Sequence, residues 1–408
     1  MITVEKALQI VLDHTRILEP INVPILQAIG MVLAEDIVSS EDIPPYDMAT
    51  IEGFALRSSN IANSDRSRPT ALILDGEVKP GDRWDHIIQS GHALKVTAGA
   101  PLPDGVDSVI SSDHAVRESA KKVRIYSSQK PGEHIFIRGA DIEAGSTVLP
   151  QGKVLGAPDI GALGAIGRSE VLCYRKPRVS FFASGNDLIS PDGPPQSGKL
   201  RAGNTCALQI RLSEYGAEPI NLGIFEINPD DVENRVNTAL ESDMLIATAG
   251  SSFSDFDTMK AILQRVGMDL KFWRVAIRPG KPLIFGTFNG VPIFGLSSNI
   301  LSSMVVLEQF VRPAIMKMQG RRELRRMEVV ARLEKDLNGG GGITHFVRAE
   351  VRLTDDGFMA IPAGSRNSPS VKAFSTANGF IVMPPEVEHI CAGEMVKVQI
   401  ISDPSNLN

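Results

Sequence analysis

The sequence RVSFFASGNDL, residues 178–188, decides what kind of fold the central part of the chain can form. Residues 179–183 (VSFFA) are almost entirely apolar over the length of one strand, and a polar loop, SGND, follows directly. Residues 244–248 (MLIAT) repeat this pattern before a second polar loop. Strands that are apolar on both sides are buried on both faces, which is typical of a parallel sheet covered by helices.

Further strands and helices are expected to alternate with these two. The pattern predicts strands at 179–183, 219–224, 244–248, 283–288 and 291–294, and helices at 204–215, 230–240, 257–266 and 301–318. Such alternation favours an α/β/α domain with a parallel sheet. The dipeptide Asn289-Gly290 predicts a hairpin between the last two strands.

The sequence on both sides of this region has a different character. Thr3 is expected to cap an N-terminal helix, and Pro158 to open a short helix in which Gly161 and Gly164 let another backbone pack closely. Short alternating apolar runs predict β structure on either side of the central region. We therefore expect a discontinuous N-terminal linker domain, an inserted β-rich domain, the α/β/α domain and a C-terminal β domain of barrel-like form, at residues 1–43 with 134–174, 44–133, 175–322 and 323–408, respectively.

The composition excludes several classes of protein. The 408 residues carry 48 acidic and 42 basic side chains, a net charge of −6, which argues against a nucleic-acid or anionic membrane partner. The four arginines at 321, 322, 325 and 326 are accordingly interpreted as a solvated linker. The 3 cysteines lie far apart, which excludes a disulfide scaffold and a structural zinc site. We expect a soluble, cytoplasmic protein.

Four polar loops are predicted at one edge of the central sheet. Ligands of open α/β sheets bind beyond the carboxyl ends of the strands, and loops 184–187, 200–204, 249–257 and 295–299 are rich in Ser, Gly, Asn and Asp. The same residues cap helices and form turns, which explains any one such loop. Four loops at one edge favour a phosphate-bearing ligand, since helix N-termini bind anions.

The turn Arg278-Pro279-Gly280-Lys281 adds two cations that could face an anion, although an ordinary surface turn explains the same residues. The sequence contains no GxxxxGK[ST], no GxGxxG after a strand, no HExxH and no GxSxG. A Walker-type NTPase, a Rossmann dehydrogenase, a His-ligated metal centre and a GxSxG nucleophile elbow therefore lack support. A divalent metal would have to be bound by oxygen ligands, as Mg²⁺ commonly is.

Several segments occur in the order known from one family. They are PPYDMATIEGFA (44–55), TAGAPLPDGVDSVI (97–110), ASGNDL (183–188), AGSSFSDFDTMK (249–260), IRPGKPLIFG (277–286), GLSSNILSS (295–303) and SPSVKAFSTANGFIVMP (368–384). Together they resemble the molybdopterin molybdenumtransferases, the group that includes the E domain of gephyrin. The resemblance spans essentially the whole chain. It implies a four-domain homodimer that performs the last step of molybdenum cofactor biosynthesis.

The resemblance also implies the reaction and the residues that serve it. Adenylylated molybdopterin and molybdate are the expected partners, and Mg²⁺ would assist hydrolysis of the anhydride with release of AMP. The carboxylates expected to act in catalysis and to bind the metal are Asp187, Asp257 and, from the partner subunit, Glu52. The expected substrate-binding residues are Thr97, Ser184, Asn204, Gly250, Ser251, Ser252, Ser254, Arg278, Lys281, Ser297, Ser298 and Asn299.

Several site positions depart from the family pattern. Glu52 stands where the family has Asp, Asn186 replaces another acid, and the usual PGNP loop reads Ser297-Ser298-Asn299-Ile300. An alternative is therefore a catalytically degenerate member that binds a pterin or a protein partner without turnover. A third possibility is an interaction protein, since the E domain of gephyrin also anchors receptors.

Overall fold

The computed structural model describes residues 1–249, 253–363 and 375–402. The chain separates into two compact units, each described here by itself. The first unit comprises residues 1–34, 152–155 and 171–408, and the second comprises 35–151 and 156–170. The four domain boundaries expected from the sequence are finer than this division and stay a prediction.

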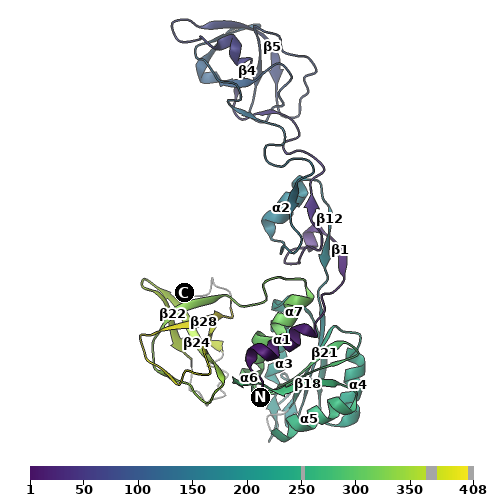
Figure 1. The fold of residues 1–408 in the computed structure, drawn as a ribbon. Helices are drawn as coiled ribbons and strands as arrows, with labels where there is room; N and C mark the ends of the chain where they lie inside the picture. The colour runs from purple at the N-terminus through teal and green to yellow at the C-terminus, as the bar shows by residue number, and fades with distance from the viewer. Residues whose placement is uncertain (250–252, 364–374, 403–408) are drawn as a thin grey trace. The chain divides into compact units, whose positions relative to one another are not determined.

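The first unit is built around a six-stranded sheet in the order β16-β13-β17-β21-β20-β18 (Figure 1). Four neighbouring strands are parallel, which confirms the parallel core of the α/β/α prediction: β16 (Glu218–Phe225), β13 (Arg178–Ser184), β17 (Met244–Ala249) and β21 (Val291–Ser297). The sheet is nevertheless mixed. β20 (Pro282–Phe288) runs antiparallel to β21 through the Asn289-Gly290 turn, and β18 (Asp269–Arg274), which the sequence analysis missed, pairs antiparallel with β20.

Helices cover both faces of this sheet because successive strand residues point to opposite sides. Phe181 and Ile246 pack with α1 (Val4–Asp13), α3 (Gly203–Glu214), α6 (Ile300–Val306) and α7 (Arg312–Met318). Phe182 and Leu245 pack with α4 (Pro229–Ala239) and α5 (Phe253–Arg265) on the other face. Two helix predictions need correction. α5 begins at Phe253, so Asp257 lies within the helix, and the helix expected at 301–318 contains a π-helical turn at Leu307–Val311.

The first unit also contains the C-terminal β sheet, whose strands close on themselves. The order is β19-β24-β25-β22-β28-β26, and an additional pairing of β26 with β24 completes the barrel-like ring. The strands are β19 (Ile277–Arg278), β22 (Glu328–Leu333), β24 (Thr344–Thr354), β25 (Gly357–Pro362), β26 (Gly379–Met383) and β28 (Met395–Ile400). β19 comes from the central region, so the strand that carries Arg278 joins this sheet.

The linker between the two sheets is not simply solvated, contrary to the expectation for its arginines. Nε of Arg326 lies 2.8 Å from Oε2 of Glu308, a side chain that is only 3% exposed. A guanidinium bound to a buried carboxylate is fixed in place. The linker is therefore anchored to the central domain through Arg326.

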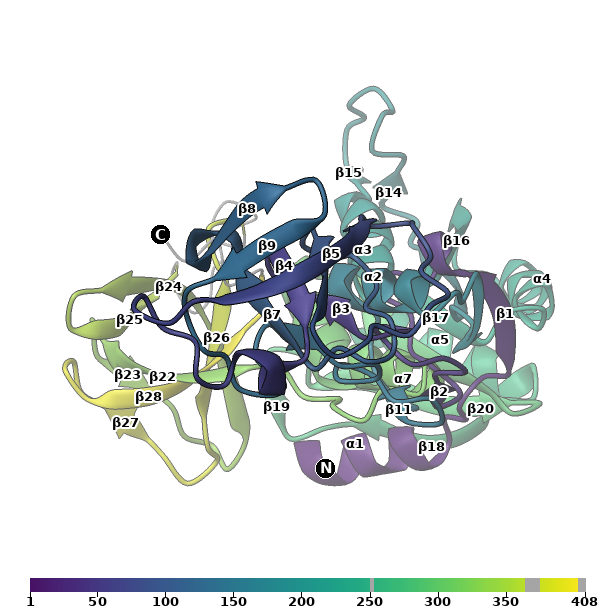
Figure 2. The same ribbon diagram turned by 90° about the horizontal axis from the view of Figure 1, so that it is seen from above.

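The second unit contains a six-stranded sheet in the order β7-β4-β6-β5-β9-β8 (Figure 2). Its strands are β4 (Gly53–Leu56), β5 (Thr70–Val78), β6 (His92–Val96), β7 (Ser108–Ser111), β8 (Ala115–Ser119) and β9 (Lys122–Ile125). The helix expected at Pro158 is α2 (Ala157–Ala165). The close packing expected at Gly161 and Gly164 is wrong, because no described residue beyond the adjoining helix backbone lies within 4 Å of a Cβ built on either glycine.

No helix within the described residues is both long and apolar enough to span a membrane.

Candidate functional site

The carboxyl ends of β13, β17 and β21 form one edge of the central sheet, which we call the rim. The rim comprises residues 184–188, Ala249 and residues 297–299. The backbone N–H of Ser298 donates to the carbonyl of Ala249 at 2.7 Å, and Oγ of Ser184 donates to the carbonyl of Thr248 at 3.1 Å. Because these three strands are parallel neighbours, three of the predicted loops come together.

The fourth predicted loop reaches the rim by another route. Residues 200–204 do not follow a strand of the central sheet; they begin with β15 (Leu200–Arg201), which pairs with β14 (Leu188–Ile189). This pairing, with the Leu200 N–H donating to the Asp187 carbonyl at 2.7 Å, returns the chain to the rim where α3 begins. Nδ2 of Asn204 then donates to the carbonyl of Ser298 at 3.4 Å. Asn204 therefore connects α3 with the loop after β21.

Three predicted binding residues have structural partners. The side chain of Ser184 is fully buried and bridges β13 and β17. Oδ1 of Asn299 accepts from the N–H groups of Leu301 and Ser302, at 3.0 and 3.4 Å, and so caps α6. Ser297 is the last residue of β21, and its Oγ accepts from the N–H of Asn299 at 3.2 Å. Helix capping and strand bridging account for these contacts.

The predicted cationic turn packs against α6, the helix that begins at the rim. Gly280 has a φ of +102°, and a Cβ at this position would lie 2.9 Å from Cγ2 of Val306 and 3.5 Å from the Ser302 carbonyl. Only glycine fits such a conformation and such an approach. Arg278 and Lys281, on the two sides of Gly280, are exposed. The glycine thus holds two exposed cations beside the helix that follows the rim.

One candidate residue, Arg348, is not predicted by any sequence motif. β19 pairs with β24 so that Arg278 lies opposite His345, and Arg348 follows three residues later on β24. Phe346, which shares its face of β24, packs into the core of the central domain. Arg348 is 9% exposed, burial lowers the pKa of its guanidinium, and Nη1 has no hydrogen-bond partner among the described residues. An unpartnered nitrogen on a buried guanidinium makes Arg348 a candidate donor to an anion.

The predicted carboxylates lie in different parts of the chain. Asp187 belongs to the rim, and Asp257 is an exposed residue of α5. Glu52 and Thr97 belong to the second unit, where the side chain of Glu52 is 61% exposed and lies 3.9 Å from Nζ of Lys95. Oγ1 of Thr97 is buried and has no hydrogen-bond partner among the described residues. The metal-binding and catalytic roles of these residues stay predictions.

Four further predicted residues lie at positions 250–254. Gly250, Ser251 and Ser252 lie outside the described residues. Ser254 belongs to the first turn of α5, but its side chain is not among those described.

A magnesium site made entirely of protein ligands is not present among the described residues. They contain no group of three or more His, Cys, Asp and Glu side chains that could bind a metal ion. Mg²⁺ characteristically uses one or two carboxylates and takes its remaining ligands from water and substrate phosphates. Asp187 at the rim fits that mode of binding, with the phosphates supplied by the ligand.

Comparisons with known proteins cover nearly the whole chain. Residues 2–167 match the MoeA N-terminal region (domain I and II), residues 180–317 match a probable molybdopterin binding domain, and residues 330–401 match the MoeA C-terminal region (domain IV). The molybdopterin molybdenumtransferase of Staphylococcus epidermidis is 29% identical over 401 residues, which is 97% of this chain and 95% of the relative. The Staphylococcus aureus enzyme of the same name is 29% identical over 402 residues, with the same shares.

Solved structures agree with these matches. A molybdopterin biosynthesis MoeA protein from Pyrococcus horikoshii is 28% identical to this chain, with a TM-score of 0.88 over 99% of this chain and 100% of the other. A second structure of a MoeA protein from this organism has a TM-score of 0.83 at 27% identity, over 98% and 100% of the two chains.

Proposed function

Because the chain belongs to the molybdopterin molybdenumtransferase (MoeA) family, we propose that it inserts molybdate into adenylylated molybdopterin and releases AMP. In this reaction water hydrolyses the phosphoric anhydride, AMP leaves, and the dithiolene sulfurs of molybdopterin bind molybdenum. The observation that carries the proposal is the rim together with the cationic turn beside α6. Rim loops from three parallel strands lie beside a turn that presents Arg278 and Lys281.

The cations of the first unit suit the charges of both substrates. Molybdate is a tetrahedral oxyanion, and the anhydride gains negative charge on its oxygens as the bond breaks. Donors held in advance around such oxygens stabilise the transition state. Arg278 and Lys281 can approach from the exposed turn, and Arg348 offers a buried guanidinium on the strand that pairs with Arg278.

The remaining rim residues receive different roles in this proposal. Ser298 is proposed to contact the substrate. Asn204 holds the loop after β21 in place, because its amide joins that loop to α3. Ser184 and Asn299 act as positioning residues, because their side chains serve the backbone. Asp187 and Asp257 would hold Mg²⁺ with the substrate phosphates, and the ion would neutralise charge on the leaving group. The contribution of Glu52 from a partner subunit, substrate binding by Thr97, the homodimer and a cytoplasmic location complete the proposal.

The proposal is tested by following AMP release from adenylylated molybdopterin with molybdate and Mg²⁺. We expect release well above the rate in buffer and its loss when EDTA removes the metal. Asp187→Asn should lower the rate, by about 10²-fold if the carboxylate acts on the transition state. Asp269→Asn is the matched control, because Asp269 lies on edge strand β18 with its side chain 67% exposed. Pterin binding without AMP release would instead support the degenerate alternative, which the enzyme names of the relatives do not favour.

A further inference from the structure

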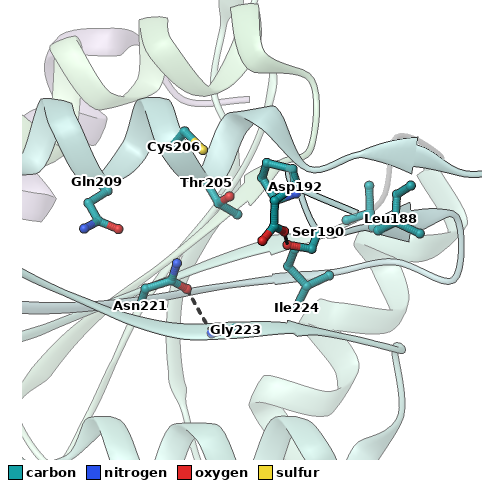
Figure 3. Close-up of a pocket in the computed structure, with 11 residues that line it drawn as sticks. Leu188, Ser190, Asp192, Thr205, Cys206, Gln209, Asn221, Gly223 and Ile224 are labelled. Carbon is teal, nitrogen blue, oxygen red and sulfur yellow. Dashed lines mark hydrogen bonds between the residues drawn. The ribbon is translucent and has the colours of Figure 1, made fainter. Parts of the chain in front are cut away.

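A pocket of about 530 Å³ lies next to the rim, between α3, β16 and the segment that follows Asp187 (Figure 3). It adjoins the rim, because Leu188 belongs to both and Thr205 directly follows Asn204, whose amide contacts Ser298 of the rim. The pocket is lined by Leu188, Ile189, Ser190, Pro191, Asp192, Thr205, Cys206, Gln209, Asn221, Gly223 and Ile224. None of the roles assigned so far uses it.

The charge of the pocket excludes phosphate as its ligand. None of the described lining residues is basic, and Asp192 contributes a negative charge. The exposed cations Arg278 and Lys281 lie instead on the turn that packs against α6, the helix that begins at the rim. A substrate that carries both phosphates and a ring would therefore place the phosphates at the rim and the uncharged ring in the pocket.

The remaining lining fits a flat ring with polar edges. Leu188, Pro191 and Ile224 supply apolar surface against which a ring can pack. Gln209 on α3 and Asn221 on β16 turn their side-chain amides toward the same space (Figure 3). Oδ1 of Asn221 accepts from the Gly223 N–H at 2.9 Å, which fixes the amide and leaves Nδ2 as a donor. Apolar walls with a few oriented polar groups are typical of small-molecule sites.

We infer that this pocket binds the planar, amino-substituted nitrogen heterocycle of a phosphate-bearing substrate. Two rings of the proposed substrate have this chemistry, adenine and the pterin. Both present alternating donors and acceptors to the two amides and an amino group to Asp192. The inference rests on the proposed function for the identity of the substrate, whereas the pocket and its lining stand independently of it.

Cys206 provides a direct probe of occupancy. Its side chain is exposed and lines the pocket, while Cys173 is buried and Cys391 is the other exposed cysteine. In full-length protein carrying Cys391→Ser, alkylation by iodoacetamide should therefore report on Cys206. The alkylation rate, read from the modified peptide by mass spectrometry, is measured with adenosine, with pterin and with inorganic phosphate.

We expect adenosine or pterin to slow alkylation of Cys206, by about tenfold at ten times its Kd, and phosphate to leave it unchanged. The ring that protects identifies which half of the substrate occupies the pocket. Gln209→Ala should weaken protection several-fold. Gln264→Ala, an exposed glutamine of α5, should not. Absence of protection by both rings, or equal protection in the two variants, would overturn the inference.

The alkylation experiment and the AMP-release assay test the pocket and the proposed function separately. Protection of Cys206 without AMP release retains the heterocycle pocket and removes the transferase activity. AMP release without protection by either ring retains the activity and removes the pocket.

Discussion

The hydroxyl of Tyr215 donates a hydrogen bond of 2.7 Å to Oε1 of Glu308, and the two residues are only 2% and 4% exposed. The same carboxylate binds Arg326 of the linker, with Nε 2.8 Å from Oε2. Tyr215 caps the C-terminal end of α3, and Glu308 lies in the π-helical turn that follows α6. One buried carboxylate thus joins the helix that lines the pocket to the segment leading into the C-terminal sheet.

Replacing Tyr215 with Phe should destabilise the first unit. The variant leaves a buried carboxylate with one donor fewer, and hydrogen bonds to charged groups contribute about 1.5–3 kcal/mol. We expect a loss of this size in the free energy of unfolding at pH 7, measured with urea. Tyr46→Phe is the matched control, because Tyr46 is 42% exposed.

The same variant tests a pH dependence. Burial, and then the charge of Glu308, raises the pKa of Tyr215 well above its ordinary value of 10.0. Above pH 10 the unfolded phenol loses its proton while the folded one keeps it, so the unfolded state binds fewer protons and stability falls as pH rises. The slope is up to about 1.4 kcal/mol per pH unit. The stability difference between the wild type and Tyr215→Phe should therefore narrow above pH 10; a constant difference would contradict the raised pKa.

Asn299 allows helix capping to be separated from anion binding. Ala removes the acceptor for the N–H groups of Leu301 and Ser302, which should cost about 1 kcal/mol of stability. Asp keeps an acceptor and should retain stability within a few tenths of a kcal/mol. Asp also adds a negative charge at the rim, so molybdate should bind about tenfold more weakly to Asn299→Asp, a difference of about 1.4 kcal/mol.

Unfolding in urea and calorimetric titration with molybdate measure the two effects. The two variants should rank oppositely in stability and in molybdate affinity. Asn299→Ala should be the less stable variant, and Asn299→Asp should bind molybdate more weakly. Equal molybdate affinity in the two variants would place the anion away from the start of α6.

The sequence predicts the architecture well where local chemistry and burial agree. Thr3 accepts from the Lys6 N–H at 3.2 Å as an N-cap, and Asn289 and Gly290 have φ values of 49° and 81°, which a tight hairpin needs. The edge strand β18 was not predicted because its residues are less buried than those of the parallel strands, so they lack a continuous apolar run.

The site was harder to predict because Ser and Asn side chains can either bind a ligand or hydrogen-bond to the backbone. Ser184 and Asn299 have the composition of binding residues, yet their side chains hold the backbone. Arg348 could not be predicted from the sequence. Alternation along β24 shows which residues share a face, but not that this face packs against the central domain. The heterocycle pocket combines residues from 188–192, α3 and β16 that no motif connects.

Lys281 is the exposed cation whose removal should disturb the fold least. Lys281→Ala should raise the molybdate concentration for half-maximal AMP release by about tenfold. Loss of one charge-assisted contact worth about 1.4 kcal/mol weakens binding by that factor. Lys335→Ala is the control, since its side chain is 71% exposed and pairs with Glu334 just after β22 ends. An equal effect of the two variants would show that general positive charge, rather than this turn, attracts molybdate.

Gly280 should be more sensitive than either of the cations beside it. Ala at this position would have to adopt a φ of +102° and place its Cβ 2.9 Å from Cγ2 of Val306, a β-branched side chain that cannot easily move away. We expect a stability loss of about 1–3 kcal/mol. AMP release should fall further than in Lys281→Ala, because the turn carries both Arg278 and Lys281 away from their positions.

Gly290 provides the matched control for this substitution. Its φ is +81°, but no atom lies within 4 Å of a Cβ built on it, so Gly290→Ala carries the backbone cost without the clash. This variant should lose about 1 kcal/mol of stability and keep its rate of AMP release, because the hairpin lies at the other end of β21 from the rim. If Gly280→Ala matched Gly290→Ala in both measurements, the packing of the cationic turn against α6 would have no part in catalysis, and Arg278 and Lys281 would act independently of where that turn is held.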